Sequence, residues 1–216
     1  MTANYTSIFA DTVESKFGVE LDIQYPLCPS RFVVWGLLFY VASIVFFQPH
    51  KKVKPKQIQQ KSSTQGNVIK KKKQRTFGPI EAVIFVHNLV LAIFSLLCFI
   101  NTAPIVYNLF ATYGFSEGIC KFHTIYDSEV STFGYWSYLF YLSKYWEFID
   151  TWIVIARGRR PIFLQEYHHI GAVIGMWAIT ITKSSAGYLF IVQNSFIHTV
   201  MYTYYAFSVI GYKFPL

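Results

Sequence analysis

Five long apolar stretches alternate with polar segments along the chain, at about residues 31–47, 80–100, 133–155, 164–181 and 188–210. Each stretch approaches the roughly 20 residues that a helix needs to cross a hydrocarbon core of about 30 Å. Backbone groups inside a membrane must be hydrogen-bonded within their own segment, so these stretches are expected to be helices. The pattern therefore predicts an all-α, polytopic membrane helix bundle. A single domain over residues 1–216 is expected, because the polar segments are too short to hold another.

Composition and charge agree with a membrane protein and give it an orientation. Hydrophobic residues make up 53% of the 216 positions, and charged residues make up 14%. Ten of the nineteen Lys and Arg residues lie between Lys51 and Arg75, within the polar segment at residues 48–76. With alternating spans, fourteen basic residues fall on one side and four on the other, which by the positive-inside rule predicts a cytosolic loop 48–76 and a lumenal amino terminus. This basic segment between two apolar spans is expected to be a plain cytosolic loop rather than a contact for nucleic acid, with attraction to anionic lipid headgroups as an additional option.

The three cysteines have neither the spacing of a metal clip nor that of a redox pair. Cys28 and Cys120 fall on the same predicted side of the membrane, where a disulfide between them is conceivable. Cys98 falls within a span.

The third span carries charged residues that a membrane helix normally excludes. Each costs roughly 2.5–3.5 kcal/mol at the bilayer centre on insertion scales. At ~100° per residue, Glu147, Asp150 and Thr151 lie about −60°, −120° and −20° from Lys144, on one stripe facing away from lipid. A salt bridge that joins helices would explain the group, but intramembrane ionisable residues are first of all functional candidates.

Two further polar clusters lie at similar depth. The fourth span places Gln165 at i−3 and i−4 from His168 and His169, so the three can share a site. The fifth span carries a stripe at i, i+4, i+8 and i+11, which consists of Asn194, His198, Tyr202 and Tyr205. Hydrogen bonds between helices could account for either cluster alone. Stripes on three consecutive spans favour a site instead.

These residue types suit a transfer or acid–base reaction. Histidine can act as base, acid or nucleophile, and an acyl group on an imidazole is highly activated. A lysine beside a carboxylate can bind an anion such as a malonyl carboxylate. Asn and Tyr can donate hydrogen bonds to a developing enolate. The residues predict a reactive site inside the bundle that opens toward the cytosol.

Three ordered motifs carry a family resemblance. They are KYWEFIDT (residues 144–151), QEYHH (165–169) and NSFIHTVMYTYY (194–205), with a weaker signature in His87-Asn88 and Ser95. From about Ile80 to its end, the chain resembles the ELO family of very-long-chain fatty acid elongases. The resemblance implies a 3-oxoacyl-CoA synthase of the endoplasmic reticulum membrane, which condenses a long acyl-CoA with malonyl-CoA and needs no cofactor. It further implies a barrel of six spans plus a peripheral helix, an acyl tunnel closed on the lumenal side, and a dehydratase and reductases as partners.

The resemblance also implies roles for individual residues. His168 is expected to be the nucleophile that takes the acyl chain, with His169 orienting it or relaying protons. His198 and Asn194 would assist malonyl decarboxylation and stabilise the enolate. The remaining expected residues hold the cluster, contact the thioester end or shape the pocket: Lys144, Glu147, Asp150, Gln165, Tyr202 and Tyr205.

Two departures from the family pattern leave alternatives open. Gln165 stands where the histidine box usually begins, which argues against a metal role because an amide replaces an imidazole poorly. Members with this glutamine include enzymes of polyunsaturated chains, which adds such chains to the expected substrates. The five spans lack the last two of the family's seven helices, so a second copy could complete the site. Three alternatives stay open: an inactive or partner-dependent truncated elongase, a di-iron desaturase or hydroxylase, and a transporter. The di-iron enzyme would need more histidines than the six present.

Overall fold

The computed structural model describes residues 29–49, 77–121 and 132–212, and all of its regular elements there are helices. They are α2 (Ser30–Phe47), α3 (Pro79–Cys120), α5 (Thr132–Trp146), α6 (Phe148–Ala156), α7 (Phe163–Thr182) and α8 (Ala186–Val209). The all-α prediction is confirmed. The predicted loop 48–76 lies largely outside the described residues. The Cys28–Cys120 pairing is not tested, because Cys28 also lies outside them.

The helices have the length and surface of membrane spans. By themselves α2 and α3 are long and apolar enough to cross a bilayer, with mean hydropathies of 1.8 and 2.6 over an 18-residue stretch of each. Their outward faces expose large apolar side chains, with Trp35 exposed by 70% and Phe46 by 77%. Such surfaces are costly in water and favourable in lipid. The 20 residues of α7 and the 24 of α8 reach across the core as well, although polar side chains lower their hydropathy.

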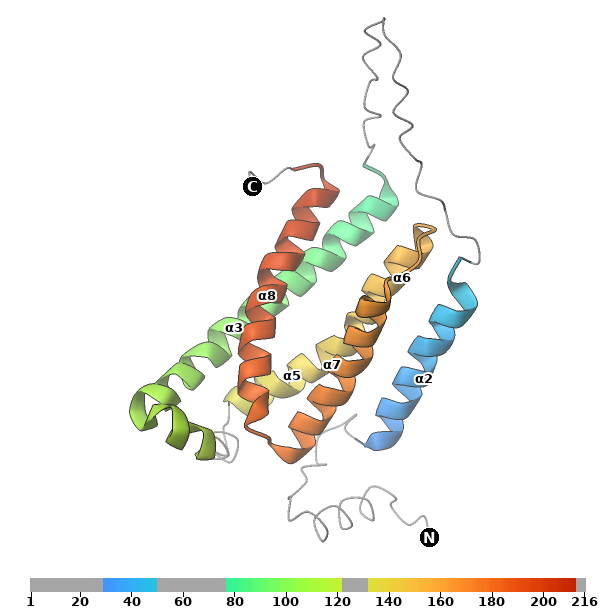
Figure 1. The fold of residues 1–216 in the computed structure, drawn as a ribbon. Coiled ribbons are helices and arrows are strands. Elements are labelled where there is room, and N and C mark those ends of the chain that lie inside the picture. The colour runs from blue at the N-terminus through green and yellow to red at the C-terminus, as the bar shows by residue number, and fades with distance from the viewer. Residues whose placement is uncertain (1–28, 50–76, 122–131, 213–216) are drawn as a thin grey trace, which may run out of the picture.

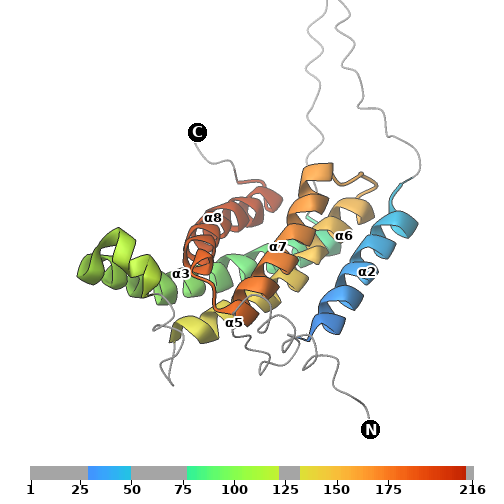
Figure 2. The ribbon, with the colours of Figure 1, turned by 60° about the horizontal axis from the view of Figure 1, so that its bottom comes forward.

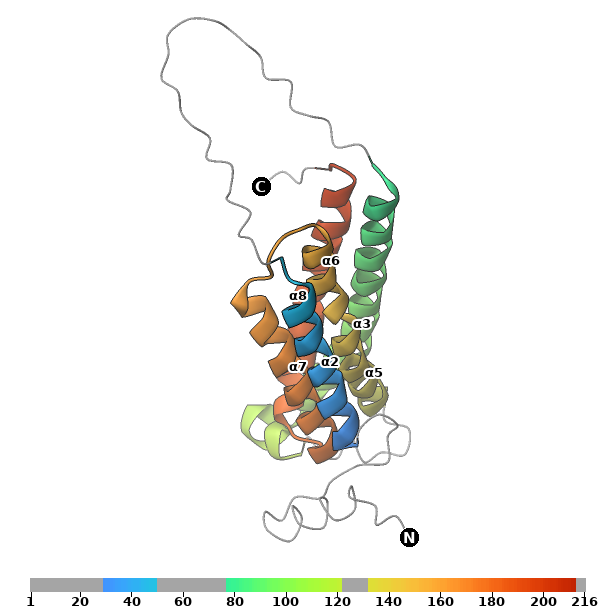
Figure 3. The same cartoon turned by 90° about the vertical axis from the view of Figure 1, so that its right-hand side faces the viewer.

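Successive spans alternate in direction. The last turns of α2, α6 and α8 lie at the same end of the bundle as the first turns of α3 and α7 (Figures 1 and 3). Helix α3 packs mainly along α8, α5 contacts both α3 and α7, and α2 lies at the edge beside α6 and α7 (Figure 2). The predicted up-and-down order is therefore confirmed, with the Arg157–Arg160 turn at that shared end.

The prediction of one helix over residues 133–155 is wrong in one respect. The segment forms two helices, α5 and α6, which meet at Glu147. There the Asp150 amide donates to the Glu147 carbonyl, three residues back, at 3.1 Å. The turn is tightened at the residue that carries the buried carboxylate.

The second span was predicted to end at Ile100, before the sequence NTAP, and this is also wrong. Helix α3 continues through Pro104 to Cys120. Membrane helices tolerate an interior proline, and the polar residues before it bond to their own helix. Asn101 Nδ2 and Thr102 Oγ1 each donate to the carbonyl four residues back, at 2.7 and 2.8 Å.

The distal part of α3 turns back on itself at Gly114. This residue has φ +74° and ψ 171°, a conformation open essentially only to glycine. The turn brings the last segment against Phe110, so closely that a Cβ on Gly118 would lie 2.7 Å from that ring. The green end of α3 in Figure 1 shows the bend.

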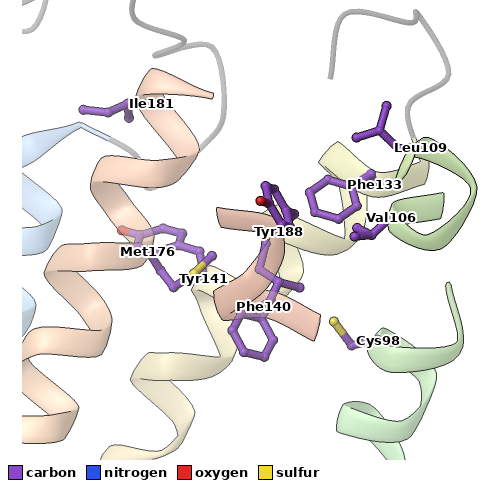
Figure 4. Close-up of a cluster of buried hydrophobic side chains, with 10 residues drawn as sticks. Cys98, Val106, Leu109, Phe133, Phe140, Tyr141, Met176, Ile181 and Tyr188 are labelled. Carbon is purple, nitrogen blue, oxygen red and sulfur yellow. The ribbon is translucent and has the colours of Figure 1, made fainter. Parts of the chain in front are cut away.

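An apolar core fills the half of the bundle away from the shared end. Its buried members come from α3, α5, α7 and α8 (Figure 4), and they are Cys98, Val106, Leu109, Phe133, Phe140, Tyr141, Met176, Ile181, Tyr188 and Ile191. A second cluster attaches α2, where the ring of Tyr40 stacks on Phe148 at 4.1 Å between centroids. The ionisable side chains of the predicted site lie outside this apolar core.

Candidate active site

A cavity of about 560 Å³ lies between α3, α6, α7 and α8. Eight of the ten predicted site residues line it: Glu147, Asp150, Gln165, His168, His169, His198, Tyr202 and Tyr205. Arg157 and Arg159, from the turn that joins α6 to α7, also line it, and sequence reasoning assigned them only to the orientation of the chain. The cavity therefore reaches the end of the bundle where the basic residues gather.

Lys144 and Asn194 lie behind this lining and support it. Lys144 Nζ donates to Glu147 Oε1 at 2.7 Å and to Asn194 Oδ1 at 2.9 Å. It also lies 3.8 Å from the centre of the Phe140 ring, a cation–π contact. Lys144 and Glu147 are each only 1% exposed, so their charges are sequestered from solvent as a pair. The predicted closeness of Lys144 to Glu147 is confirmed.

Glu147 in turn orients His198. The Nδ1 atom of His198 lies 3.3 Å from Glu147 Oε1. A ring nitrogen that faces a carboxylate carries the proton, which leaves Nε2 of the neutral imidazole as an acceptor. Carboxylate and imidazole thus form the base-and-orienter pair typical of acid–base and nucleophilic sites.

Two buried polar atoms on the cavity wall have no hydrogen-bond partner among the described residues. They are Glu147 Oε2 and His169 Nδ1. Buried polar atoms are nearly always satisfied, so each such exception calls for an explanation such as a catalytic role or an ordered water. Both residues line the same cavity.

Asp150 is not part of the Lys144 group, contrary to the predicted grouping. Its Oδ1 lies 2.8 Å from His87 Nε2, and its Oδ2 accepts from the Tyr202 hydroxyl at 2.6 Å. His87 is a site neighbour that sequence reasoning noted only as a weak signature. The available signal was a histidine next to Asn88 within the mostly apolar second span.

The histidine pair on α7 divides between two environments. His169 is buried, and its ring lies edge-on to Tyr40 and Phe148. His168 is exposed toward the cavity, with ring centroids 5.8 Å from His169 and 6.4 Å from His198. The structure therefore brings three histidine rings to one wall.

Gln165 lines the same cavity, as predicted, but its amide contacts another helix. Its Nε2 donates to Thr151 Oγ1 at 3.4 Å, and that hydroxyl is 2.9 Å from the Tyr40 hydroxyl of α2. The edge helix α2 is thus coupled to the site through Thr151.

Glu147, His168 and His198 could also approach a metal ion. Their ligand atoms all lie within 4.8 Å of one another, the one such group found among the described residues. Two imidazoles and a carboxylate are a donor set that Zn²⁺ and Fe²⁺ accept. Here, however, the Lys144 ammonium already neutralises the carboxylate at 2.7 Å, and a divalent ion would add charge beside it. That the site works without metal stays a prediction.

Fold and site together define a multi-pass membrane protein with a histidine-lined cavity between its helices. The family model described as ELO, the GNS1/SUR4 family, matches residues 28–216. The chain belongs to this family.

Curated relatives agree with this assignment. The chain is 35% identical to very long chain fatty acid elongase 6 of Drosophila melanogaster, over 61% of this chain and 41% of the relative. It is 35% identical to putative fatty acid elongase 3 of Caenorhabditis elegans, over 63% and 42%. Against fatty acid elongase 2 of Trypanosoma brucei brucei it is 33% identical, over 62% and 49%. The chain thus spans less than half the length of these relatives, and no solved structure matches it.

Proposed function

We propose that this protein elongates fatty acids by condensing an acyl-CoA with malonyl-CoA, which yields a 3-oxoacyl-CoA, CO₂ and free CoA. Family membership and the names of the relatives support fatty acid elongation in general. The observation that carries the finer proposal is one cavity in which His168 is accessible while Glu147 orients His198. A nucleophile and a separate base are what two successive half-reactions require.

In the first half-reaction His168 attacks the thioester carbonyl of the acyl-CoA. The new bond joins an imidazole nitrogen to the acyl carbon, the carbon–sulfur bond breaks, and CoA leaves with the proton that the ring gives up. His168 suits this role because its ring is exposed to the cavity, whereas His169 and His198 are buried. His169, in contact through its ring, would position it.

In the second half-reaction malonyl-CoA loses CO₂, and the electron pair of the broken bond forms an enolate. The enolate attacks the acyl carbon on His168, the carbon–nitrogen bond breaks, and the departing ring takes back one proton from solvent. His198 is placed to relay this proton through Nε2, since Nδ1 faces Glu147. Asn194 does not line the cavity and its Oδ1 accepts from Lys144, so we assign it to holding Lys144 rather than to direct contact with the enolate.

The cavity suggests how the substrates enter. Arg157 and Arg159 match the phosphates of CoA at the end that we assign to the cytosol. The thioester would then lie among the histidines, with the acyl chain directed toward the apolar half of the bundle. We assign the protein to the endoplasmic reticulum membrane with its amino terminus in the lumen. A dehydratase and reductases would process the product, and a second copy of the chain is a further proposed partner.

The proposal is tested with the 216-residue chain in membranes of low background elongation. Acyl-CoA and radiolabelled malonyl-CoA are supplied, and labelled 3-oxoacyl product is measured for the wild type, His168→Ala and Phe163→Ala. Phe163 is a matched control, since it lies on the same helix, is 78% exposed and does not line the cavity. We expect product from the wild type and the control but none from His168→Ala.

Acyl-CoA alone separates the half-reactions. Mass spectrometry of protein incubated without malonyl-CoA should find the acyl group on a peptide that contains His168. Undiminished condensation by His168→Ala would refute the assignment of the nucleophile. Absence of both product and adduct in the wild type would refute the proposed activity of this chain.

A further inference from the structure

A chain of hydrogen bonds outside the reactive histidines runs through four helices. The Trp146 indole at the end of α5 donates to His87 Nδ1 on α3 at 3.2 Å. His87 Nε2 lies 2.8 Å from Asp150 Oδ1 on α6, and the Tyr202 hydroxyl on α8 donates to Asp150 Oδ2 at 2.6 Å. His87 and Tyr202 are buried, with exposures of 6% and 1%. Only Asp150 and Tyr202 of this chain of bonds line the cavity.

The partners of His87 determine which of its nitrogens carries the proton. An indole N–H can only donate, so Nδ1 must accept and therefore has no proton. The neutral ring then carries its proton on Nε2, which donates to Asp150. Each carboxylate oxygen of Asp150 thus accepts one hydrogen bond, one from α3 and the other from α8. The carboxylate cannot turn toward Lys144 without losing both.

The last member of the chain of bonds touches the proposed base. The Tyr202 ring lies edge-on to His198, with centroids 5.2 Å apart and planes at 90°. Glu147 holds His198 from one side through Nδ1, and Tyr202 confines the ring from another. The orientation of Tyr202 depends on Asp150, and that of Asp150 depends on His87.

We propose that His87 is a positioning residue for the decarboxylation half-reaction: as a fixed Nε2–H donor it holds Asp150, through which Tyr202 keeps His198 aligned. This inference rests on the proposed function, since His198 is the base there. Histidine rather than any other residue is needed because one ring must accept from Trp146 and donate to Asp150 from two separate nitrogens.

The test uses substitutions of His87 that place an amide nitrogen near the position of either Nε2 or Nδ1. The amide nitrogen of Gln reaches about as far as Nε2, whereas the amide of Asn reaches only as far as Nδ1. We compare His87→Gln, His87→Asn and His87→Phe. The Gln variant should retain condensation within about threefold of wild type, while the Asn and Phe variants should lose about tenfold or more, as loss of a bond to a charged group predicts. Acylation of His168 by acyl-CoA alone should stay within about twofold in all three, because the positioning acts on His198.

The double variant His87→Phe with Tyr202→Phe adds a second criterion. Because both residues act through Asp150, its loss should be no greater than about that of the worse single variant, not the product of the two. Equal activity of His87→Gln and His87→Asn would overturn the inference, and so would a parallel loss of His168 acylation. A wild type without any activity would instead refute the proposed function. In that case the inference about His87 is tested by the ¹⁵N NMR signals of its ring in detergent micelles. A proton on Nδ1 instead of Nε2 would show that His87 is not a fixed Nε2–H donor to Asp150.

Discussion

The Lys144–Glu147 pair makes the sharpest prediction about stability. Lys144→Met keeps the length of the stem but removes the ammonium group, and Glu147 Oε1 is then left with only the His198 contact at 3.3 Å. Removing one partner of a buried ion pair strands the other charge and costs about 3–5 kcal/mol. For a chain of this size that corresponds to a fall in unfolding temperature on the order of 10 °C.

A second substitution tests whether the cost comes from the stranded charge. Lys144→Met combined with Glu147→Gln removes both charges, and the amide oxygen can still accept from His198. The double variant should return to within about 1–2 kcal/mol of wild type, because a buried pair replaced as a whole is often nearly neutral. It should not regain condensation activity, since His198 no longer faces a carboxylate.

The assay is the fraction of protein that stays monodisperse by size exclusion after heating in detergent micelles. Lys121→Met is the matched control, because Lys121 pairs with Glu117 at 3.0 Å but both side chains are well exposed. An exposed pair of this kind contributes less than about 1 kcal/mol. If the double variant is as unstable as Lys144→Met, the destabilisation does not come from the unpaired carboxylate and the reasoning fails.

Two further predictions follow from the backbone and from the donor set. Gly114→Ala should destabilise the protein by about 1–3 kcal/mol because φ is +74°, even though the added Cβ would meet no atom within 4 Å. Gly171→Ala, on a helix with equal space, should be neutral or slightly stabilising. Equal effects of the two substitutions in the same heating assay would contradict the backbone argument. Purified protein should contain no stoichiometric zinc or iron and should keep its activity in a chelator, whereas one metal per chain, lost together with activity, would show that Glu147, His168 and His198 hold an ion.

Sequence patterns predicted where the helices lie well but where they end poorly. Hydropathy marks where a helix could lie in lipid, and a proline with polar neighbours is the usual sign that it stops. In α3 the polar side chains of Asn101 and Thr102 bond to carbonyls of their own helix, and the helix continues past Pro104 all the same. The break at Glu147 gave no signal at all, since no glycine or proline stands there.

Partners across helices were the part of the site that one sequence could not predict. Periodicity gives the direction of a side chain around its own helix, but not which neighbour stands there. The sequence placed His87 beside Asn88 as part of a weak signature but did not indicate its bond to Asp150 of α6. Tyr40 was missed for the same reason, because the edge position of α2 beside α6 and α7 is set by packing.

The angular positions of the charged residues on the third span nevertheless indicated that Lys144 and Asp150 face different neighbours. On an ideal helix Asp150 lies about 120° from Lys144, too far for both to face one neighbour, while Glu147 lies between them. In the structure Lys144 faces Asn194, Asp150 faces His87 and Tyr202, and Glu147 faces His198. The two polar groups then meet only around His198, which contacts Glu147 from one and Tyr202 from the other. The charged residues of the third span therefore do not form one salt-bridge cluster. Glu147, paired with Lys144, and Asp150, through Tyr202, hold the His198 imidazole from two separate directions.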